Sequence, residues 1–371
     1  MTFYKVAHLT SVHSRRDTRI FLKECRSLAN FGHKVSLIVA DGNGSDRIGG
    51  VDIYDVGSMN GRLNRIRNAP KKILKLAFEV NADIYHLHDP ELLPIGVKLK
   101  RAGKIVIFDA HEDVPKQILG KAYINKYFKW IISKSYGIYE RWACRRLDAV
   151  VSATPFIRDK FIAMGVRSID INNYPLLDEF VIRNIDWSKK NRQVTYIGGL
   201  GRVRGIFEMV KSMEVTKSDV QLVVGGKFSL KSFEEQVTSL SGWAKVDYLG
   251  WLDRSDIKKV LSESVGGLVT LHPIINYLDA LPVKMFEYMA AGIPVIASDF
   301  PFWREIVEGS ESGICVNPLD PEEIAAAIDY LVKCPEEAER MGRNGQQAVI
   351  DKYNWGIEEE KLCAFYLSLS S

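Results

Sequence analysis

The chain has 371 residues, of which 46% are hydrophobic and 26% charged, and its formal net charge is +4. This length suffices for two domains of ordinary size, and the composition excludes a disordered or fibrous protein. No apolar run reaches the roughly 20 residues that a membrane-spanning helix needs. The five cysteines form no Cys-x-x-Cys pair, which argues against a zinc site and against a disulfide framework.

Positive charge is concentrated in the first half of the chain. Residues 1–180 hold 29 Lys and Arg against 19 Asp and Glu, whereas 181–371 hold 21 against 27. We therefore expect the first half to meet an anionic partner, which is a membrane surface, a phosphorylated acceptor or a nucleic acid. The first residues run from Met1 into strand-like sequence without a signal-peptide or transit-peptide pattern, so we expect a cytoplasmic protein.

Short apolar runs alternate with longer helical patterns along the whole chain. In the first half, strands are predicted at 5–11, 34–40, 51–56, 84–88, 104–109 and 149–153. In the second half, they are predicted at 193–200, 220–226, 246–250, 267–272, 294–297 and 313–316. Strands rich in Val, Ile and Leu and separated by helices indicate parallel sheets of βαβ units.

Two such series predict an α/β protein with two doubly wound, Rossmann-like domains that face a central cleft. The polar stretch 175–192 marks the expected boundary between them. We accordingly predict domains at 1–180 and 193–352, with 353–371 as a C-terminal helix that crosses back to the first domain. Ligands of open α/β sheets bind beyond the carboxyl ends of the strands, so the cleft is the expected site.

The segment 276–308 carries two acidic residues separated by seven others, near the start of a predicted helix. They are Asp279 and Glu287. A ribose offers two neighbouring hydroxyls, and one carboxylate can accept hydrogen bonds from both. The alternatives are that Asp279 caps the helix and that Glu287 is a solvent-facing carboxylate on its surface.

The glycine-rich segment 196–205 follows the first strand of the second domain and precedes a helix. It contains Gly199, Arg202 and Arg204. Arginines beside a helix N-terminus can stabilise the negative charge that a departing diphosphate develops. The alternative is a turn with two solvated arginines. No Asp-x-Asp pair that would hold a metal occurs in the sequence.

Two further loops of the first domain carry candidate site residues. The end of the strand 104–109 and the loop after it contain His111. As one alternative, the acidic residues Asp109, Glu112 and Asp113 suggest a metal site together with His86 and His88. As another, His111 is a loop histidine without a catalytic role. The loop after the first strand is basic, with Arg15, Arg16 and Arg19. These arginines are candidates for binding a phosphate of the acceptor or donor, the alternative being a solvated loop.

With these motifs, nearly the whole chain resembles the GT4 family of retaining glycosyltransferases, in particular a type associated with bacterial surface polysaccharides. The segment 276–308 is the most specific part of the resemblance. It implies the GT-B fold, a nucleotide-sugar donor with UDP slightly favoured, and no metal or other cofactor. It also implies that Glu287 binds the ribose, that Asp279 contacts the donor sugar, and that Lys284 belongs to the donor site.

The resemblance extends to the cations of the glycine-rich segment, which in this family contact the donor diphosphate. Arg204 matches the second of two such cations. Gly199 stands at the position of the first, and Arg202 is its expected substitute. His111 matches a histidine that meets the donor sugar near the reacting carbon. Asp279 departs from the glutamate that is common at its position.

The implied reaction is glycosyl transfer to a lipid-linked saccharide in polysaccharide biosynthesis, with the leaving phosphate taking the acceptor proton. Two alternatives are a nucleotide-sugar epimerase of the same fold and a catalytically silent scaffold in an assembly complex. Detection of a new glycosidic product would distinguish transfer from both.

Two segments of the first domain are basic and apolar together. The segment 62–76 has six cations and no acid, and 121–146 has seven cations and one acid. Such segments can lie in the headgroup layer of an anionic membrane, which predicts a peripheral protein on the inner face of the cell membrane. The alternative is that both helices pack on the domain core with their lysines solvated. The aromatic residues follow helical spacing rather than forming a stacking platform, so no nucleic-acid partner is expected.

Overall fold

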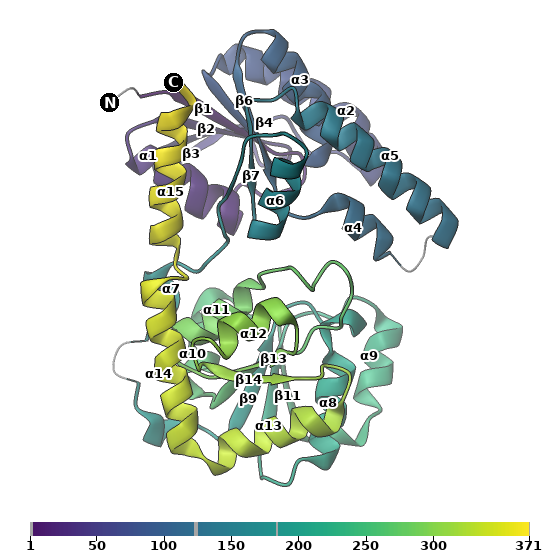
Figure 1. Cartoon of the computed structure of the whole chain (residues 1–371), viewed down its shortest axis with the longest axis vertical. Coiled ribbons are helices and arrows are strands. Elements are labelled where there is room, and N and C mark those ends of the chain that lie inside the picture. The colour runs from purple at the N-terminus through teal and green to yellow at the C-terminus, as the bar shows by residue number, and fades with distance from the viewer. Residues whose placement is uncertain (1–2, 122–124, 183–184, 371) are drawn as a thin grey trace. The chain divides into compact units, whose positions relative to one another are not determined.

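The computed structural model describes residues 3–121, 125–182 and 185–370 and divides the chain into two compact units (Figure 1). Unit 1 comprises Met1–Asn173 and Ile357–Ser371, and unit 2 comprises Tyr174–Gly356. The division falls just before the expected boundary segment 175–192, because Tyr174 packs into the core of unit 2, 4.7 Å from Phe286 between ring centroids. Of the predicted segments, residues 122–124, 183–184 and 371 lie outside the described residues.

Unit 1 is built on an eight-stranded sheet whose neighbours are parallel except at the edge pair β3–β4. In spatial order the strands are β3 (Asp46–Ile48), β4 (Val51–Asp55), β2 (Lys34–Val39), β1 (Lys5–Leu9), β5 (Ile84–Leu87), β6 (Ile105–Ala110), β7 (Ala149–Ser152) and β8 (Ser168–Asp170). The strand order reverses at β1, which lies between β2 and β5. Such a switch point places a crevice at the carboxyl ends of the strands.

The helices of unit 1 cover this sheet. They are the π-helical segment Thr18–Cys25, α1 (Arg26–Asn30), α2 (Arg62–Val80), α3 (Leu93–Arg101), α4 (Val114–Leu119), α5 (Lys126–Cys144), α6 (Pro155–Ala163) and α15 (Trp355–Leu367). Helix α15, yellow in Figure 1, belongs to unit 1 from Ile357 onward, and the hydroxyl of its Tyr366 lies 2.8 Å from Nδ1 of His86. In the described part of the chain, no helix combines the length and apolar content needed to span a bilayer.

Unit 2 is built on a six-stranded, fully parallel sheet. In spatial order the strands are β11 (Val246–Gly250), β10 (Gln221–Gly225), β9 (Gln193–Ile197), β12 (Gly266–Val269), β13 (Val295–Ser298) and β14 (Gly313–Val316). Its helices are α7 (Leu177–Phe180), α8 (Ile206–Val215), α9 (Lys231–Thr238), α10 (Arg254–Glu263), α11 (Val283–Ala290), α12 (Pro301–Val307), α13 (Pro321–Lys333) and α14 (Pro335–Asp351). The strand order reverses at β9. The predicted α/β class with two doubly wound sheets is confirmed.

Candidate active site

The glycine-rich segment after β9 approaches its neighbours at two positions that exclude a side chain. Gly198 has a φ of +143°, and a Cβ there would lie 2.7 Å from Nζ of Lys284. Gly205 has a φ of +77°, and a Cβ there would lie 2.0 Å from the carbonyl oxygen of Thr270. Both positions require glycine because any side chain would be strained or would clash. The segment is thereby held against α11 at the carboxyl edge of the sheet.

Lys284 of α11 is a buried cation without a hydrogen-bond partner in the structure. Its side chain is 9% exposed, and Nζ lies 3.8 Å from the ring centroid of Tyr196. Burial, and then the positive charge of Arg204, hold the pKa of Lys284 well below its usual range. A buried ammonium without an anionic partner is costly, so this position is suited to binding an anionic ligand.

The two arginines of the segment lie in different surroundings. Arg204 has its guanidinium carbon 5.5 Å from the ring centroid of Tyr277, and within the described residues no carboxylate forms an ion pair with it. Arg202 instead donates to the amide oxygen of Gln236 and lies 5.3 Å from the ring of Phe233. Both belong to one 3-10 turn, in which side chains two positions apart point in different directions. The structure therefore brings Arg204 together with Lys284, and Arg202 with α9.

Gly199, the position at which a cation was expected, borders open space. A Cβ built there meets no atom within 4 Å. No neighbouring side chain replaces the missing charge at that point. Lys284, 85 residues further along the chain, is the cation whose pKa is lowered by the charge of Arg204.

Glu287 lies one turn after Lys284 on α11 and is held by an ion pair. Its Oε1 accepts from Nη1 of Arg254 at 2.8 Å, and Arg254 also contacts Glu179 at 3.1 Å. The carboxylate is half-buried and oriented, so it is not the solvent-facing surface residue of the alternative interpretation. Asp279 lies in the loop before α11. The N-cap position of α11 is Pro282, three residues after Asp279.

A cavity of about 830 Å³ lies at the carboxyl ends of β1, β5 and β6, within unit 1. We call it the unit 1 cavity. Its residues come from the loops after these strands and from α2, α4 and α5, and they include His13, His111, Ile66, Phe108, Tyr136 and Tyr139. The lining mixes apolar and aromatic side chains with many charged and polar ones, so it suits a polar organic ligand such as a saccharide.

His13 and His111 face each other in the unit 1 cavity, with ring centroids 5.2 Å apart. Nδ1 of His13 lies 3.1 Å from Oδ2 of Asp17. Burial lowers the pKa of His13, but the hydrogen bond to Asp17 and the charge of Asp89 outweigh burial and raise this pKa above its usual value. His13, beside His111, is therefore more readily protonated than an ordinary histidine.

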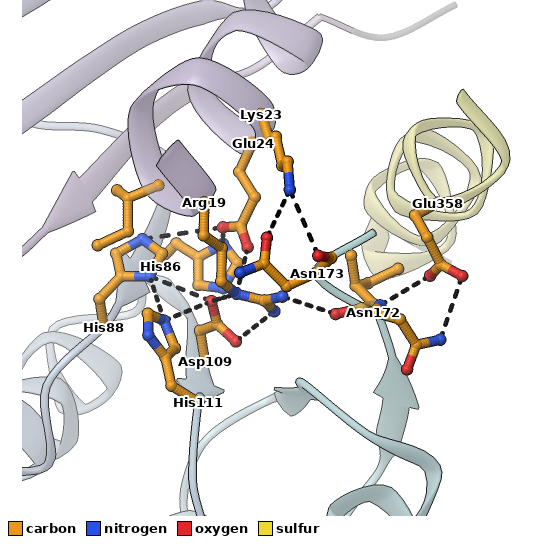
Figure 2. Close-up of polar contacts among 12 residues, drawn as sticks. Arg19, Lys23, Glu24, His86, His88, Asp109, His111, Asn172, Asn173 and Glu358 are labelled. Atoms are coloured by element: carbon orange, nitrogen blue, oxygen red, sulfur yellow. Dashed lines mark hydrogen bonds and ion pairs between the residues drawn. The ribbon is translucent and has the colours of Figure 1, made fainter. Parts of the chain in front are cut away.

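His111 is bound to a buried network, part of which is shown in Figure 2. Nε2 of His111 is 2.9 Å from Oδ2 of Asp109, and Arg19 donates to both oxygens of Asp109, at 3.0 and 2.8 Å. Arg19 also contacts Glu24 at 3.1 Å and donates to the carbonyl oxygen of Ile171. Asp109 thus fixes which edge of the His111 ring faces the interior, and Arg19 fixes Asp109.

Several side chains in and below this network are of metal-binding types. Two groups have ligand atoms within 4.8 Å of one another, and they consist of His8, Glu24, His86 and His88 and of His88, Asp109 and His111. Nδ1 of His8 and Nε2 of His88 are 2.8 Å apart, a hydrogen-bond distance. The acids that follow His111 are engaged elsewhere, Glu112 with Gln117 and Asp113 with Lys160. The acids and histidines that the sequence suggested as metal ligands therefore do not all lie at one site.

Comparison with known proteins assigns the chain to a family. The family model described as Glycosyltransferase Family 4 matches residues 18–172, and that described as Glycosyl transferases group 1 matches residues 178–348. The chain belongs to glycosyltransferase family 4. This membership makes it a transferase, as predicted.

Relatives and solved structures agree with this assignment across nearly the whole chain. An uncharacterized glycosyltransferase of Methanocaldococcus jannaschii is 23% identical, with 98% of each chain covered. The phosphatidyl-myo-inositol mannosyltransferase of Mycobacterium leprae is 21% identical, with 84% of this chain and 81% of the relative covered. The sucrose-phosphate synthase of Thermosynechococcus elongatus shares the fold with a TM-score of 0.78 at 17% identity, covering 98% of each chain. The fold of this glycosyltransferase is GT-B, as predicted.

The basic loop of this family 4 enzyme is largely paired within unit 1. Arg19 is 4% exposed and bound to Asp109 and Glu24, so it is not available to a phosphate, and this corrects its assignment as a phosphate ligand. Arg15 donates to both oxygens of Asp41, at 2.8 and 2.7 Å. Arg16 is exposed. Of the three arginines, Arg16 alone keeps an open guanidinium.

Sequence reasoning missed two residues that the structure places at the sites. His13 lies in the basic loop after the first strand, but its contacts with Asp17 and His111 become visible only in the fold. Arg254, which orients Glu287, begins a helix 33 residues earlier and has no local signal beyond its capping aspartate.

Proposed function

We propose that this glycosyltransferase moves a sugar from a nucleoside-diphosphate donor, bound at the carboxyl edge of the unit 2 sheet, to a saccharide acceptor bound in the unit 1 cavity. The observation that carries the proposal is the pair Arg204 and Lys284, two cations without a carboxylate partner in the described structure. A diphosphate supplies the missing anion, and the pair then stabilises the charge that develops as the glycosidic bond breaks. No metal ion is required for this role.

The other donor contacts follow from the position of α11. Glu287 accepts hydrogen bonds from the two ribose hydroxyls, with Arg254 holding its carboxylate in place. Asp279 contacts hydroxyls of the donor sugar. UDP is the favoured nucleotide, and a structure of HepE from Anabaena, which shares the fold at a TM-score of 0.74 and 16% identity, is a complex with UDP-glucose.

The transfer proceeds with retention on one face of the sugar. The bond between the anomeric carbon and the diphosphate oxygen breaks, and the acceptor hydroxyl forms its new bond from the same side. The hydroxyl proton passes to the leaving phosphate oxygen, so no enzymatic nucleophile is needed. His111 lies at the reacting centre and His13 beside it, where they donate hydrogen bonds to sugar hydroxyls.

The acceptor is a lipid-linked saccharide of bacterial polysaccharide biosynthesis, and the enzyme acts at the inner face of the cell membrane. The basic surface of unit 1 supports this, because two cationic segments, 62–76 and 121–146, border the unit 1 cavity through α2 and α5. The mycobacterial relatives are named as mannosyltransferases of a phosphatidylinositol lipid.

The proposal is tested by screening UDP-, GDP-, ADP- and dTDP-sugars for a rise in melting temperature, followed by product analysis. The stabilising donor should yield a new glycosidic product with retained anomeric configuration by NMR, in the presence of EDTA. Glu287→Ala should abolish transfer and leave the melting temperature of the free enzyme nearly unchanged. Epimerised donor without a glycoside, loss of activity on chelation, or full activity of Glu287→Ala would contradict the proposal.

A further inference from the structure

The outer face of α5 carries a stripe of exposed apolar and cationic side chains, which we call the α5 stripe. It consists of Tyr127, Trp130, Ile131, Lys134, Ile138, Arg141, Trp142 and Arg145. These positions recur at intervals of three, four and seven residues and so lie on one side of the helix. The exposed fractions reach 79% for Tyr127 and 73% for Ile138. Large apolar side chains gathered on the outer face of a helix indicate a contact beyond the protein itself.

The inner face of α5 fixes this orientation. The hydroxyl of Ser133 donates to the carbonyl oxygen of Pro115, and Ala143 and Cys144 belong to the hydrophobic core. Glu140 is the single acidic residue in the helix sequence, and it is buried and paired with Lys160 at 2.7 Å. The α5 stripe therefore presents positive charge with no carboxylate of its own helix to neutralise it.

The last turn of α5 contains a hollow of about 550 Å³, which we call the arginine hollow. It is lined by Ile138, Arg141, Trp142, Arg145 and Arg146. Nη1 of Arg146 donates to the carbonyl oxygen of Trp142 at 2.7 Å, and its guanidinium carbon lies 4.3 Å from the centroid of that ring. Within the described residues, none of the three arginines forms an ion pair with a carboxylate. Three such guanidinium groups offer charge-assisted hydrogen bonds to a phosphate.

Cations also gather at helix C-termini because they complement the helix dipole, and Arg146 does so through its bond to a terminal carbonyl. The dipole does not account for the apolar members of the α5 stripe, which begin a full four turns earlier at Tyr127. Exposed aromatic and aliphatic side chains suit the apolar boundary of a bilayer, and unpaired cations suit its anionic headgroups. The α5 stripe has both.

We propose that the α5 stripe lies in the headgroup layer of an anionic bilayer and that the arginine hollow binds a lipid phosphate. This deepens the proposed function by narrowing its membrane contact from two segments to one. Helix α2 is less suited, since its Arg65 is paired with Glu91 and its Lys75 lies beside Glu79. Helix α5 also supplies Tyr136 and Tyr139 to the unit 1 cavity, so a lipid-linked acceptor in that cavity would be about one helix diameter, roughly 10 Å, from the membrane.

The experiment is co-sedimentation of the full chain with vesicles of phosphatidylcholine alone and of phosphatidylcholine with phosphatidylglycerol in equal parts. The protein should bind the anionic vesicles, and binding should weaken as salt rises. Arg141→Gln/Arg145→Gln should weaken binding by about 30-fold, from roughly fivefold per cation. Ile131→Ser/Ile138→Ser should weaken it by at least 10-fold. The matched controls on α2, Lys71→Gln/Lys75→Gln and Leu63→Ser, should change it by less than about threefold.

Three outcomes would overturn the inference. One is equal loss of binding in the α2 controls. Another is binding of inorganic phosphate at the arginine hollow of a protein that binds no vesicles, since the hollow would then be a site for a soluble anion. The third is a concentration-dependent dimer, seen by analytical ultracentrifugation, that Ile131→Ser/Ile138→Ser abolishes. The donor-induced rise in melting temperature is measured on every variant. If the donor still raises the melting temperature of a protein that binds no vesicles, this inference fails and the proposed function stands. If the donor causes no rise, the proposed function fails.

Discussion

The cations of the two units differ in what they are paired with. In unit 1, Arg19 is buried between Asp109 and Glu24, so its charge is satisfied within the fold. In unit 2, Lys284 is buried next to Arg204 and neither has a carboxylate partner in the described structure. Burial alone therefore does not mark a ligand site. A buried cation marks one when its counter-ion is missing, because the ligand must then provide it.

The sharpest contrast is between two arginines of the same basic loop. Arg19→Met should lower the free energy of unfolding by about 3–5 kcal/mol, because it leaves the carboxylate of Asp109 buried without its cation. Arg16→Met, at an exposed position, should change it by no more than about 0.5 kcal/mol. Urea unfolding of both variants measures the difference. Equal stabilities would show that the network is not held by Arg19.

The arginines of unit 2 should differ in activity rather than stability. Arg204→Ala should lower kcat by about 100- to 1,000-fold, the usual cost of removing one donor that stabilises transition-state charge. Arg202→Ala should lower kcat by less than about threefold, because Arg202 lies against Gln236 and Phe233 of α9, away from Lys284. Initial rates at saturating donor decide the matter. If the two variants were equally damaging, both arginines would meet the diphosphate, as the sequence predicted, and the contact of Arg202 with Gln236 would not describe the working enzyme.

A third variant tests whether Lys284 lacks a partner in the free enzyme. Lys284→Met should abolish transfer and yet stabilise the free protein by about 2 kcal/mol, because it removes an unsatisfied buried ammonium. The folded-state pKa of Lys284 is depressed, so the folded protein gives up this proton more readily than the unfolded chain. Wild-type stability should therefore rise relative to the variant as pH increases toward the ordinary lysine pKa.

The matched control for this variant is Lys211→Met on the exposed face of α8, which should leave stability and its pH dependence unchanged. A destabilised Lys284→Met protein would mean that the ammonium is paired in the free enzyme, and the argument from a missing counter-ion would then fail.

The sequence predicted the fold well because its signals are local. The predicted alternation of strands and helices is confirmed. The strands β3 and β8 were missed because three residues carry too little periodicity. Pairing could not be predicted, since it joins distant positions. Nothing near Arg19 in the sequence indicates that Asp109, 90 residues away, neutralises it, and nothing near Arg204 indicates Lys284.

The smallest predicted effect concerns Glu24, the second acid beside Arg19. Burial, and then the charge of Asp109, raise the pKa of Glu24 well above its usual range, which outweighs the opposing charge of Arg19. A carboxyl group whose folded pKa is raised destabilises the protein once the pH passes its unfolded pKa of about 4.3, and the penalty grows until the folded pKa is reached. Glu24→Gln keeps the shape without the titration, so it should equal wild type near pH 4 and exceed it by about 1 kcal/mol at pH 7. Urea unfolding at both values provides the measurement. A variant less stable than wild type at pH 7 would show that the charged form of Glu24 is favoured beside Arg19, against the direction of its pKa shift.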